Sequence, residues 1–254
     1  MFELFTGHRD RHRQKPLTDE QRATIDENVP YARRLNEADR RELEGLVRIF
    51  LDDKTFEGCA GLELTEEMRV TIAAQACVLL VHREGDVYPD LETILVYPHV
   101  FKAKLQHREG EVLIEGEEAR LGESSSRGVV VLAWDHVNRG THPGGAGHNV
   151  VFHELAHQLD AEDGAMDGAP DLGSRTRYQA WARVFGRAYK LLGRYVEAGV
   201  SSDIDAYGAQ SPAEFFAVAT EMFFEKPRAL RKRHPELYAE LAAFYCQDPA
   251  AFVT

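Results

Sequence analysis

Apolar residues recur at helical spacing through the first ninety positions of the chain. Three stretches carry the pattern, 18–27, 36–53 and 65–84, and each opens on a residue whose side chain can cap a helix N-terminus. These residues are Thr18, Asn36 and Thr65. We therefore predict that the N-terminal part, about residues 1–90, consists of helices.

From about residue 92 the pattern changes to short runs rich in Val, Ile and aromatic residues, bounded by glycine, proline and charged residues. Such runs are typical of strands, which we predict at 93–101, 111–119 and 128–137. A glycine-rich turn follows at 142–149. Helical spacing then returns, at about 150–161, 175–198, 211–226 and 235–247. Helices, a small sheet and helices again predict an α+β fold.

The charge balance argues against one class of partner. The 254 residues include 42 Asp and Glu against 30 Lys and Arg, which gives a net charge of −12 with neutral histidines. Non-specific nucleic-acid binding needs a basic surface, so we expect no direct nucleic-acid partner. The N-terminus becomes charged before an apolar signal segment can form, and the most apolar stretch, 72–81, is about half a membrane span. We therefore expect a cytoplasmic protein without a membrane partner.

The three cysteines point to no particular chemistry. They are widely spaced, odd in number and never form a C-x-x-C pair, so they predict neither a disulfide framework nor a cysteine zinc site. A metal site in this chain would have to be built from other side chains.

The residues that can carry chemistry concentrate in segment 149–160, which contains the motif H-E-x-x-H. On a helix, His153 and His157 lie on one face about 6 Å apart, so both can direct a ring nitrogen at one metal ion. Glu154 lies one step round the helix, where a general base can reach a water molecule beside the metal. Zinc suits imidazole, and catalytic zinc sites take three protein ligands.

Two residues compete for the position of the third ligand. Glu214 stands three residues after Ser211, which with Pro212 marks the start of a helix, so its carboxylate could complete a capping box instead of binding a metal. The apolar residues that follow predict a buried helix, and a buried carboxylate needs a partner, which favours a metal ligand. Asp163, six residues after His157, is the alternative.

Two more carboxylates could support the site. Asp160, three residues after His157, could accept a hydrogen bond from an imidazole and orient it, or could lie at a solvated helix end. Glu221, on the same helix face as Glu214, could take such a role or be only a charge on that face.

Three segments together resemble a known family. The segments GVVVLAWDHV, HELAHQLD and YGAQSPAEFFAVATEMFFEKP are similar to those of the Mlc titration factor A family of bacterial zinc-dependent peptidases, and the helix pair is similar to the catalytic domain of anthrax lethal factor. The most specific match is H-E-x-x-H followed, 57 positions after its second His, by the Glu of E-F-F-A, with a Tyr seven residues before that Glu. The resemblance implies a zincin-like metallopeptidase, in one domain over 1–254 with a catalytic core over about 91–254.

The resemblance also implies a role for each residue of the site. His153, His157 and Glu214 are implied as the ligands of one Zn²⁺ ion. Glu154 is implied as the general base, and Tyr207 as a hydroxyl donor to the tetrahedral intermediate of peptide hydrolysis.

The substrate and the partner follow from the same resemblance. It implies aminopeptidase-like action on short peptides. It also implies that the protein binds a transcriptional repressor of sugar uptake, after which the family is named. The alternative is a non-catalytic zinc-containing protein that only sequesters a regulatory partner. We expect a peptide substrate to add to an edge strand, and segment 128–137 is the candidate for that strand.

Overall fold

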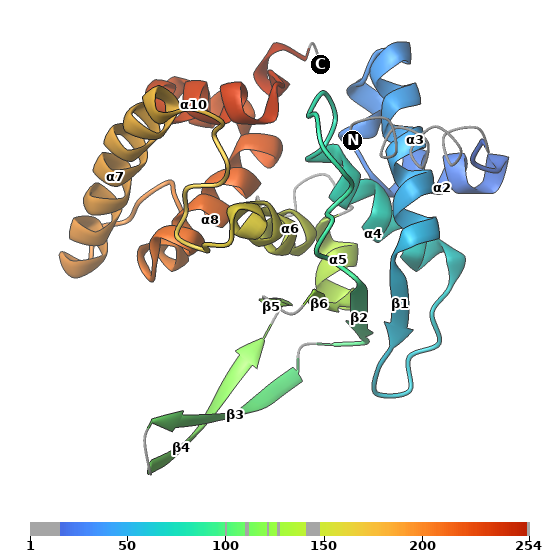
Figure 1. Ribbon diagram of the computed structural model, residues 1–254, viewed down its shortest axis with the longest axis horizontal. Coiled ribbons are helices and arrows are strands. Elements are labelled where there is room, and N and C mark those ends of the chain that lie inside the picture. The colour runs from blue at the N-terminus through green and yellow to red at the C-terminus, as the bar shows by residue number, and fades with distance from the viewer. Residues whose placement is uncertain are drawn as a thin grey trace, which may run out of the picture.

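The computed structural model describes in full residues 16–99, 128–140 and 148–252, and describes as strands, without their side chains, residues 101–109, 112–120 and 122–125. Most of the predicted glycine-rich turn, 141–147, lies outside the described residues. The N-terminal helices occupy one side of the molecule and the C-terminal helices the other, with the helix that bears H-E-x-x-H between them (Figure 1). The predicted α+β class is confirmed.

Three capped helices form the N-terminal part, namely α2 (Asp19–Asn28), α3 (Glu37–Asp53) and α4 (Glu66–Val78). The three predicted capping residues each accept hydrogen bonds from backbone N–H groups of the first turn. Helix α4 ends earlier than predicted, and the chain beyond it turns through His82, whose φ is +66°. The prediction that this part consists of helices alone is wrong, because β1 (Thr55–Gly58) pairs with a strand almost forty residues further on.

The sheet is built around two parallel central strands, β2 (Thr93–Tyr97) and β6 (Val129–Ala133), in the order β1-β2-β6-β5. Alternate side chains of β2 and β6 are buried, as expected for strands that pack on a core. Strand β1 pairs with β2 in parallel, whereas β5 (Gly122–Ser125) pairs with β6 antiparallel. A second antiparallel pair consists of β3 (Phe101–Glu109) and β4 (Val112–Arg120).

Two strand predictions need correction. The first predicted strand ends at Tyr97, because the Pro98 that follows has no N–H group to donate to a ladder. The last one ends at Ala133, and the chain continues as helix α5 (Trp134–Gly140), in which Val137 is the buried residue. Segment 128–137 is also not an edge strand, because β6 has β2 on one side and β5 on the other. Its backbone groups are therefore already paired and cannot receive a peptide.

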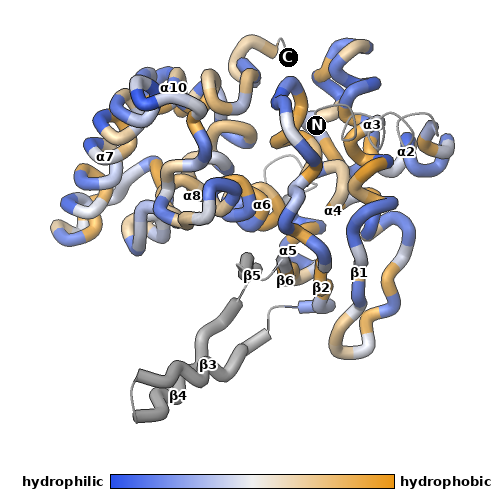
Figure 2. The backbone as a smooth tube through the Cα atoms, viewed as in Figure 1, coloured by the Kyte–Doolittle hydropathy of each residue, from blue (hydrophilic) through white to orange (hydrophobic). Residues whose placement is uncertain are grey.

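The C-terminal part consists of α6 (Val150–Asp160), α7 (Arg175–Glu197), α8 (Pro212–Glu225), α9 (Pro227–Arg233) and α10 (Pro235–Tyr245). The sequence predicts all of these except α9, which begins at a proline directly after α8 ends. One cluster of buried apolar side chains extends from Leu17 to Ala250. Apolar residues gather on α4 and around α6, whereas α2 is largely polar (Figure 2). Within the described part of the chain, no helix is long and apolar enough to cross a membrane.

Candidate metal centre

Two helices bring three potential metal ligands together. Helix α6 carries His153 and His157 one turn apart, and their rings meet edge to face with centroids 5.0 Å apart. Helix α8 packs against α6 and contributes Glu214 from its first turn. One ligand atom from each of the three residues lies within 4.8 Å of the other two.

The spacing of these atoms fits a zinc ion. Oε2 of Glu214 lies 2.9 Å from Nε2 of His153 and 3.5 Å from Nε2 of His157. Ligand atoms of a tetrahedral site with zinc–ligand distances near 2.0 to 2.1 Å are about 3.3 Å apart. Two imidazoles and one carboxylate are also the donor set of a class of catalytic zinc sites, which leave the fourth position to water or substrate. The three side chains therefore fit a single zinc ion in both geometry and chemistry.

Glu214 combines the two roles that its sequence position leaves open. Its backbone N–H donates to Oγ of Ser211 at 3.1 Å, so the helix start is capped as predicted. Its carboxylate, however, faces the two histidines. Burial raises the pKa of Glu214, but hydrogen bonds with His153 and His157 outweigh burial and lower the pKa to about 2. The carboxylate is thus anionic near neutral pH, as a metal ligand must be.

Glu221 orients His153 from the side opposite Glu214. Its Oε1 lies 2.8 Å from Nδ1 of His153, and its Oε2 accepts the backbone N–H of Asn149 at 2.6 Å. A carboxylate at Nδ1 fixes the tautomer of the ring and leaves Nε2 to a metal. Burial lowers the pKa of His153, but hydrogen bonds with Glu214 and Glu221 outweigh it and raise the pKa. Of the two roles predicted for Glu221, the structure favours orientation of the imidazole.

Glu154 and Tyr207 lie beside the cluster. Glu154 follows His153 on α6 and is buried. Tyr207 belongs to the short helix η3 (Ala206–Ala209), which packs against α8, and its ring centroid lies 5.8 Å from that of His153. Asp205 caps this short helix by accepting the N–H of Tyr207 at 2.8 Å. Because Tyr207 is 45% exposed, its side chain stands next to the histidines and can also be reached from solvent.

The two aspartates that follow the motif do not join the cluster. Asp163 is exposed, its Oδ1 accepts the N–H of Ala165, and the His-His-Glu group among the described residues does not include it. Asp160 is fully buried, so it does not lie at a solvated helix end. Its Oδ2 accepts the N–H of Gly168 at 2.8 Å. The other alternative, a hydrogen bond between Asp160 and an imidazole, is not among those that the described residues form, because the carboxylate is turned toward the loop after α6.

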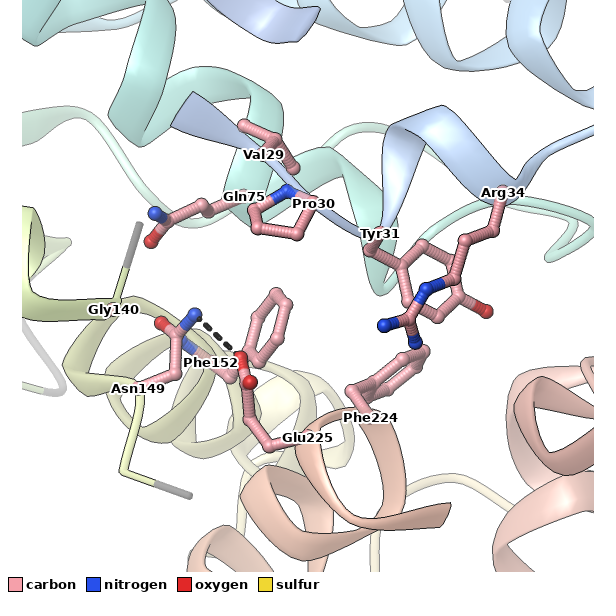
Figure 3. A pocket seen from close by; sticks show the side chains of 10 residues that line it. All are labelled: Val29, Pro30, Tyr31, Arg34, Gln75, Gly140, Asn149, Phe152, Phe224 and Glu225. Atoms are coloured by element: carbon pink, nitrogen blue, oxygen red, sulfur yellow. Dashed lines mark hydrogen bonds between the residues drawn. The ribbon is translucent and has the colours of Figure 1, made fainter. Parts of the chain in front are cut away.

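A small polar cavity lies beside the start of α6 (Figure 3). It has a volume of about 50 Å³, and none of the three clustered side chains lines it. Asn149, the N-cap of α6, donates from Nδ2 to Oε1 of Glu225 at 3.1 Å. Gln75 of α4 lies across the cavity from this pair, and its buried amide has no hydrogen-bond partner within the described residues. Asn149 and Glu225 are not predicted from the sequence, although an Asn directly before a helix is a recognisable signal.

The fold and the site together define a class of protein. An H-E-x-x-H helix, a carboxylate from a later helix that faces both histidines and a second carboxylate behind one imidazole fit a zincin-like metallopeptidase site. The model of the family described as glucose-regulated metallo-peptidase M90 matches residues 5–246 of the chain. The chain belongs to this family, and it is therefore a hydrolase of the metallopeptidase class.

Comparison with individual proteins agrees with this assignment. An uncharacterized protein of Synechocystis sp. is 42% identical over 238 residues, which cover 93% of this chain and 86% of that protein. The Mlc titration factor A proteins of Yersinia pestis and Yersinia pseudotuberculosis are each 30% identical over 228 residues, which cover 88% of this chain and 83% of theirs. The resemblance inferred from the three sequence segments is thereby confirmed.

Proposed function

We propose that this metallopeptidase is zinc-dependent, with one Zn²⁺ ion held by His153, His157 and Glu214. The observation that carries the proposal is the convergence of the three ligand atoms within 4.8 Å, with the Glu214 oxygen 2.9 and 3.5 Å from the two imidazole nitrogens. Glu221 supports it further, because a carboxylate behind a ligating histidine is the usual partner of a metal-bound imidazole.

The proposed chemistry uses two more side chains of this chain. When bound, zinc would supply Lewis acidity, which polarises a carbonyl and makes a water molecule nucleophilic at neutral pH. Glu154 takes a proton from the attacking water and delivers it to the leaving amine, the work of a general base and then a general acid. The hydroxyl group of Tyr207 donates a hydrogen bond to the oxyanion that develops on the substrate carbonyl. Its exposure beside His153 supports this role.

For the substrate, we propose short peptides with a free α-amino group, cleaved in the manner of an aminopeptidase. The support is the acidic segment that follows the H-E-x-x-H helix, because its carboxylates can attract a protonated amine. The exposed residues of this segment that we propose for the contact are Asp167 and Asp171. We place this reaction in the cytoplasm, within a single domain that spans the chain.

The test compares the purified protein with Glu154→Gln and with Glu197→Gln, an exposed control at the end of α7. We expect about one equivalent of zinc in all three by elemental analysis. Hydrolysis of unblocked peptides should fall by about 10² to 10⁴ in Glu154→Gln only. Peptides with a blocked N-terminus should be poor substrates of the wild type. Full activity of Glu154→Gln would rule out the general base, and absence of zinc from all three would rule out the zinc site.

We also propose a binding role, because relatives at 30% identity bear the name Mlc titration factor A. In this proposal the chain binds a transcriptional repressor of the Mlc type, and the binding does not require the general base. Immobilised Mlc from Yersinia pestis should retain both the wild type and Glu154→Gln. Failure to retain either protein would contradict the binding role and leave the peptidase proposal intact.

A further inference from the structure

The three proposed ligands belong to two helices, so the site depends on the separation of α6 from α8. The helices run in opposite directions: the start of α6, at Asn149, contacts Glu221 and Glu225 late in α8. Glu214, in the first turn of α8, lies near His157 in the last turns of α6. A feature that connects the end of α6 with the start of α8 would therefore act directly on the distance between these ligands.

Gly168 occupies that place, and each of its polar groups has a buried partner. Its N–H donates to Oδ2 of Asp160 at 2.8 Å, and its carbonyl oxygen accepts the indole N–H of Trp181 at 2.9 Å. Asp160 is the last residue of α6, and its side chain is fully buried. The loop that carries Gly168 is thus held to α6 by a carboxylate and to α7 by an indole.

The other face of Gly168 lies directly against α8. A Cβ atom placed on Gly168 would stand 2.3 Å from the carbonyl oxygen of Pro212 and 3.1 Å from the nitrogen of Ala213. These two residues immediately precede Glu214, and all three belong to the first turn of α8. With a φ of +80°, Gly168 also has the left-handed conformation that favours glycine. The close approach of backbone to backbone leaves little freedom for the turn that bears Glu214.

We infer that Asp160 is a positioning residue for Glu214: by holding Gly168 against the first turn of α8, it sets the separation between this carboxylate and the two histidines. Asp160 is an acceptor for a backbone N–H group and is not one of the three clustered ligands. The inference rests on the proposed zinc site, since Asp160 is inferred to position one of the same three ligands.

The test measures metal binding rather than turnover, in Asp160→Ala, Asp160→Asn and Asp163→Ala. Asp160→Ala removes the acceptor, whereas Asp160→Asn keeps an oxygen that can accept from Gly168. Asp163→Ala is the matched control, because Asp163 also accepts a backbone N–H in the next turn but is exposed. Each protein is titrated with Zn²⁺ in competition with a chromophoric chelator, and the visible absorption of its Co²⁺ form is recorded.

We expect Asp160→Ala to weaken zinc binding by about tenfold or more and to change the Co²⁺ spectrum, because Glu214 is displaced. Asp160→Asn and Asp163→Ala should bind within about threefold of the wild type, with its spectrum. Wild-type affinity and spectrum in Asp160→Ala would overturn the inference while the zinc site stands. If the wild type itself binds neither metal, the proposed zinc site falls and the inference falls with it.

A second variant decides the matter if Asp160→Ala does not fold. Trp181→Phe keeps an aromatic ring in the core but removes the donor to the carbonyl of Gly168. We expect it to weaken zinc binding in the same direction, by about threefold or more. Unchanged affinity and an unchanged Co²⁺ spectrum in Trp181→Phe would overturn the inference.

Discussion

Helices α6 and α8 are joined at both ends, and the two joints differ in kind. At the start of α6 the joint is made by two side chains of α8: Glu221 accepts the backbone N–H of Asn149, and Glu225 accepts its side-chain amide, beside a small cavity. At the end of α6 the joint is made largely of backbone, where Gly168 lies between Asp160 and the first turn of α8. Side chains can rotate and adjust, whereas a backbone contact that leaves no room for a methyl group cannot. The structure therefore suggests that the first joint tunes one imidazole and the second fixes the distance between helices.

The largest effect is expected where the backbone joint is broken by a single methyl group. Gly168→Ala places a Cβ atom 2.3 Å from the carbonyl of Pro212 and forces Ala to a φ of +80°. We expect a loss of about 3 to 5 kcal/mol in the free energy of unfolding, from overpacking and left-handed strain together. Urea denaturation of the metal-free protein measures this loss.

Gly164→Ala is the matched control for that experiment. Gly164 has a φ of +91°, yet a Cβ atom there would meet nothing within 4 Å. The variant should lose only about 1 to 2 kcal/mol, the cost of the backbone conformation alone. Equal losses in the two variants would show that the backbone at Pro212 moves to accommodate the methyl group at little cost. The contrast between the two joints would then disappear.

The next effect is a dependence on pH at the backbone joint. Burial, with the charges of Asp167 and Asp163, raises the pKa of Asp160 to about 7, although backbone N–H groups that bond to it oppose the shift. Because the folded state holds this proton more tightly than the unfolded state, the stabilisation is complete below about pH 4 and is lost as the pH rises to about 7. We expect wild-type stability to fall between pH 5 and 7 by about 2 kcal/mol more than that of Asp160→Asn. Parallel curves for the two proteins would contradict the raised pKa.

Local signals in the sequence were enough for much of the fold and for the core of the site. Capping residues located the starts of α2, α3 and α4, and the i, i+4 spacing of His153 and His157 predicted a shared helix face. These features depend on residues a few positions apart, which a linear pattern can display.

Features that depend on distant partners were missed or misassigned. Strand β1 exists because it pairs with β2, and segment 128–137 proved central because β5 covers one side of β6. For Asp160 the sequence leaves open an imidazole partner or a solvated helix end, but the conformation of the loop that carries Gly168 decides its partner. Neither sheet neighbours nor the path of such a loop can be derived from local periodicity.

Within the side-chain joint, Glu221 is expected to act on metal affinity. Glu221→Ala removes the acceptor at Nδ1 of His153, so the dissociation constant for Zn²⁺ should rise by about 10- to 100-fold in chelator competition. Glu225→Ala is the control at the same joint, because within the described residues Glu225 bonds to Asn149 and to no imidazole. That control should stay within about threefold of the wild type. Comparable losses in both variants would mean that the joint works as one unit and not through His153.

The smallest effect is expected at the cavity behind the side-chain joint. Both amide atoms of Gln75 are buried and lack a hydrogen-bond partner within the described residues, so the amide contributes no hydrogen bond to another described residue. Gln75→Met keeps the length of the side chain and removes that polar group. We therefore expect the free energy of unfolding to stay within about 1 kcal/mol of the wild type, or to increase.

Asn149→Ala gives the scale for that comparison, since it removes both the helix cap and the partner of Glu225. A capping residue of this kind is worth about 1 to 2 kcal/mol, so the loss should be measurable by the same urea titration. If Gln75→Met proved as costly as Asn149→Ala, the amide would have to be coupled to the joint through solvent in the cavity. The side-chain joint would then include α4 as well as α6 and α8. It would differ from the backbone joint in the number of helices that it connects as well as in the groups that form it.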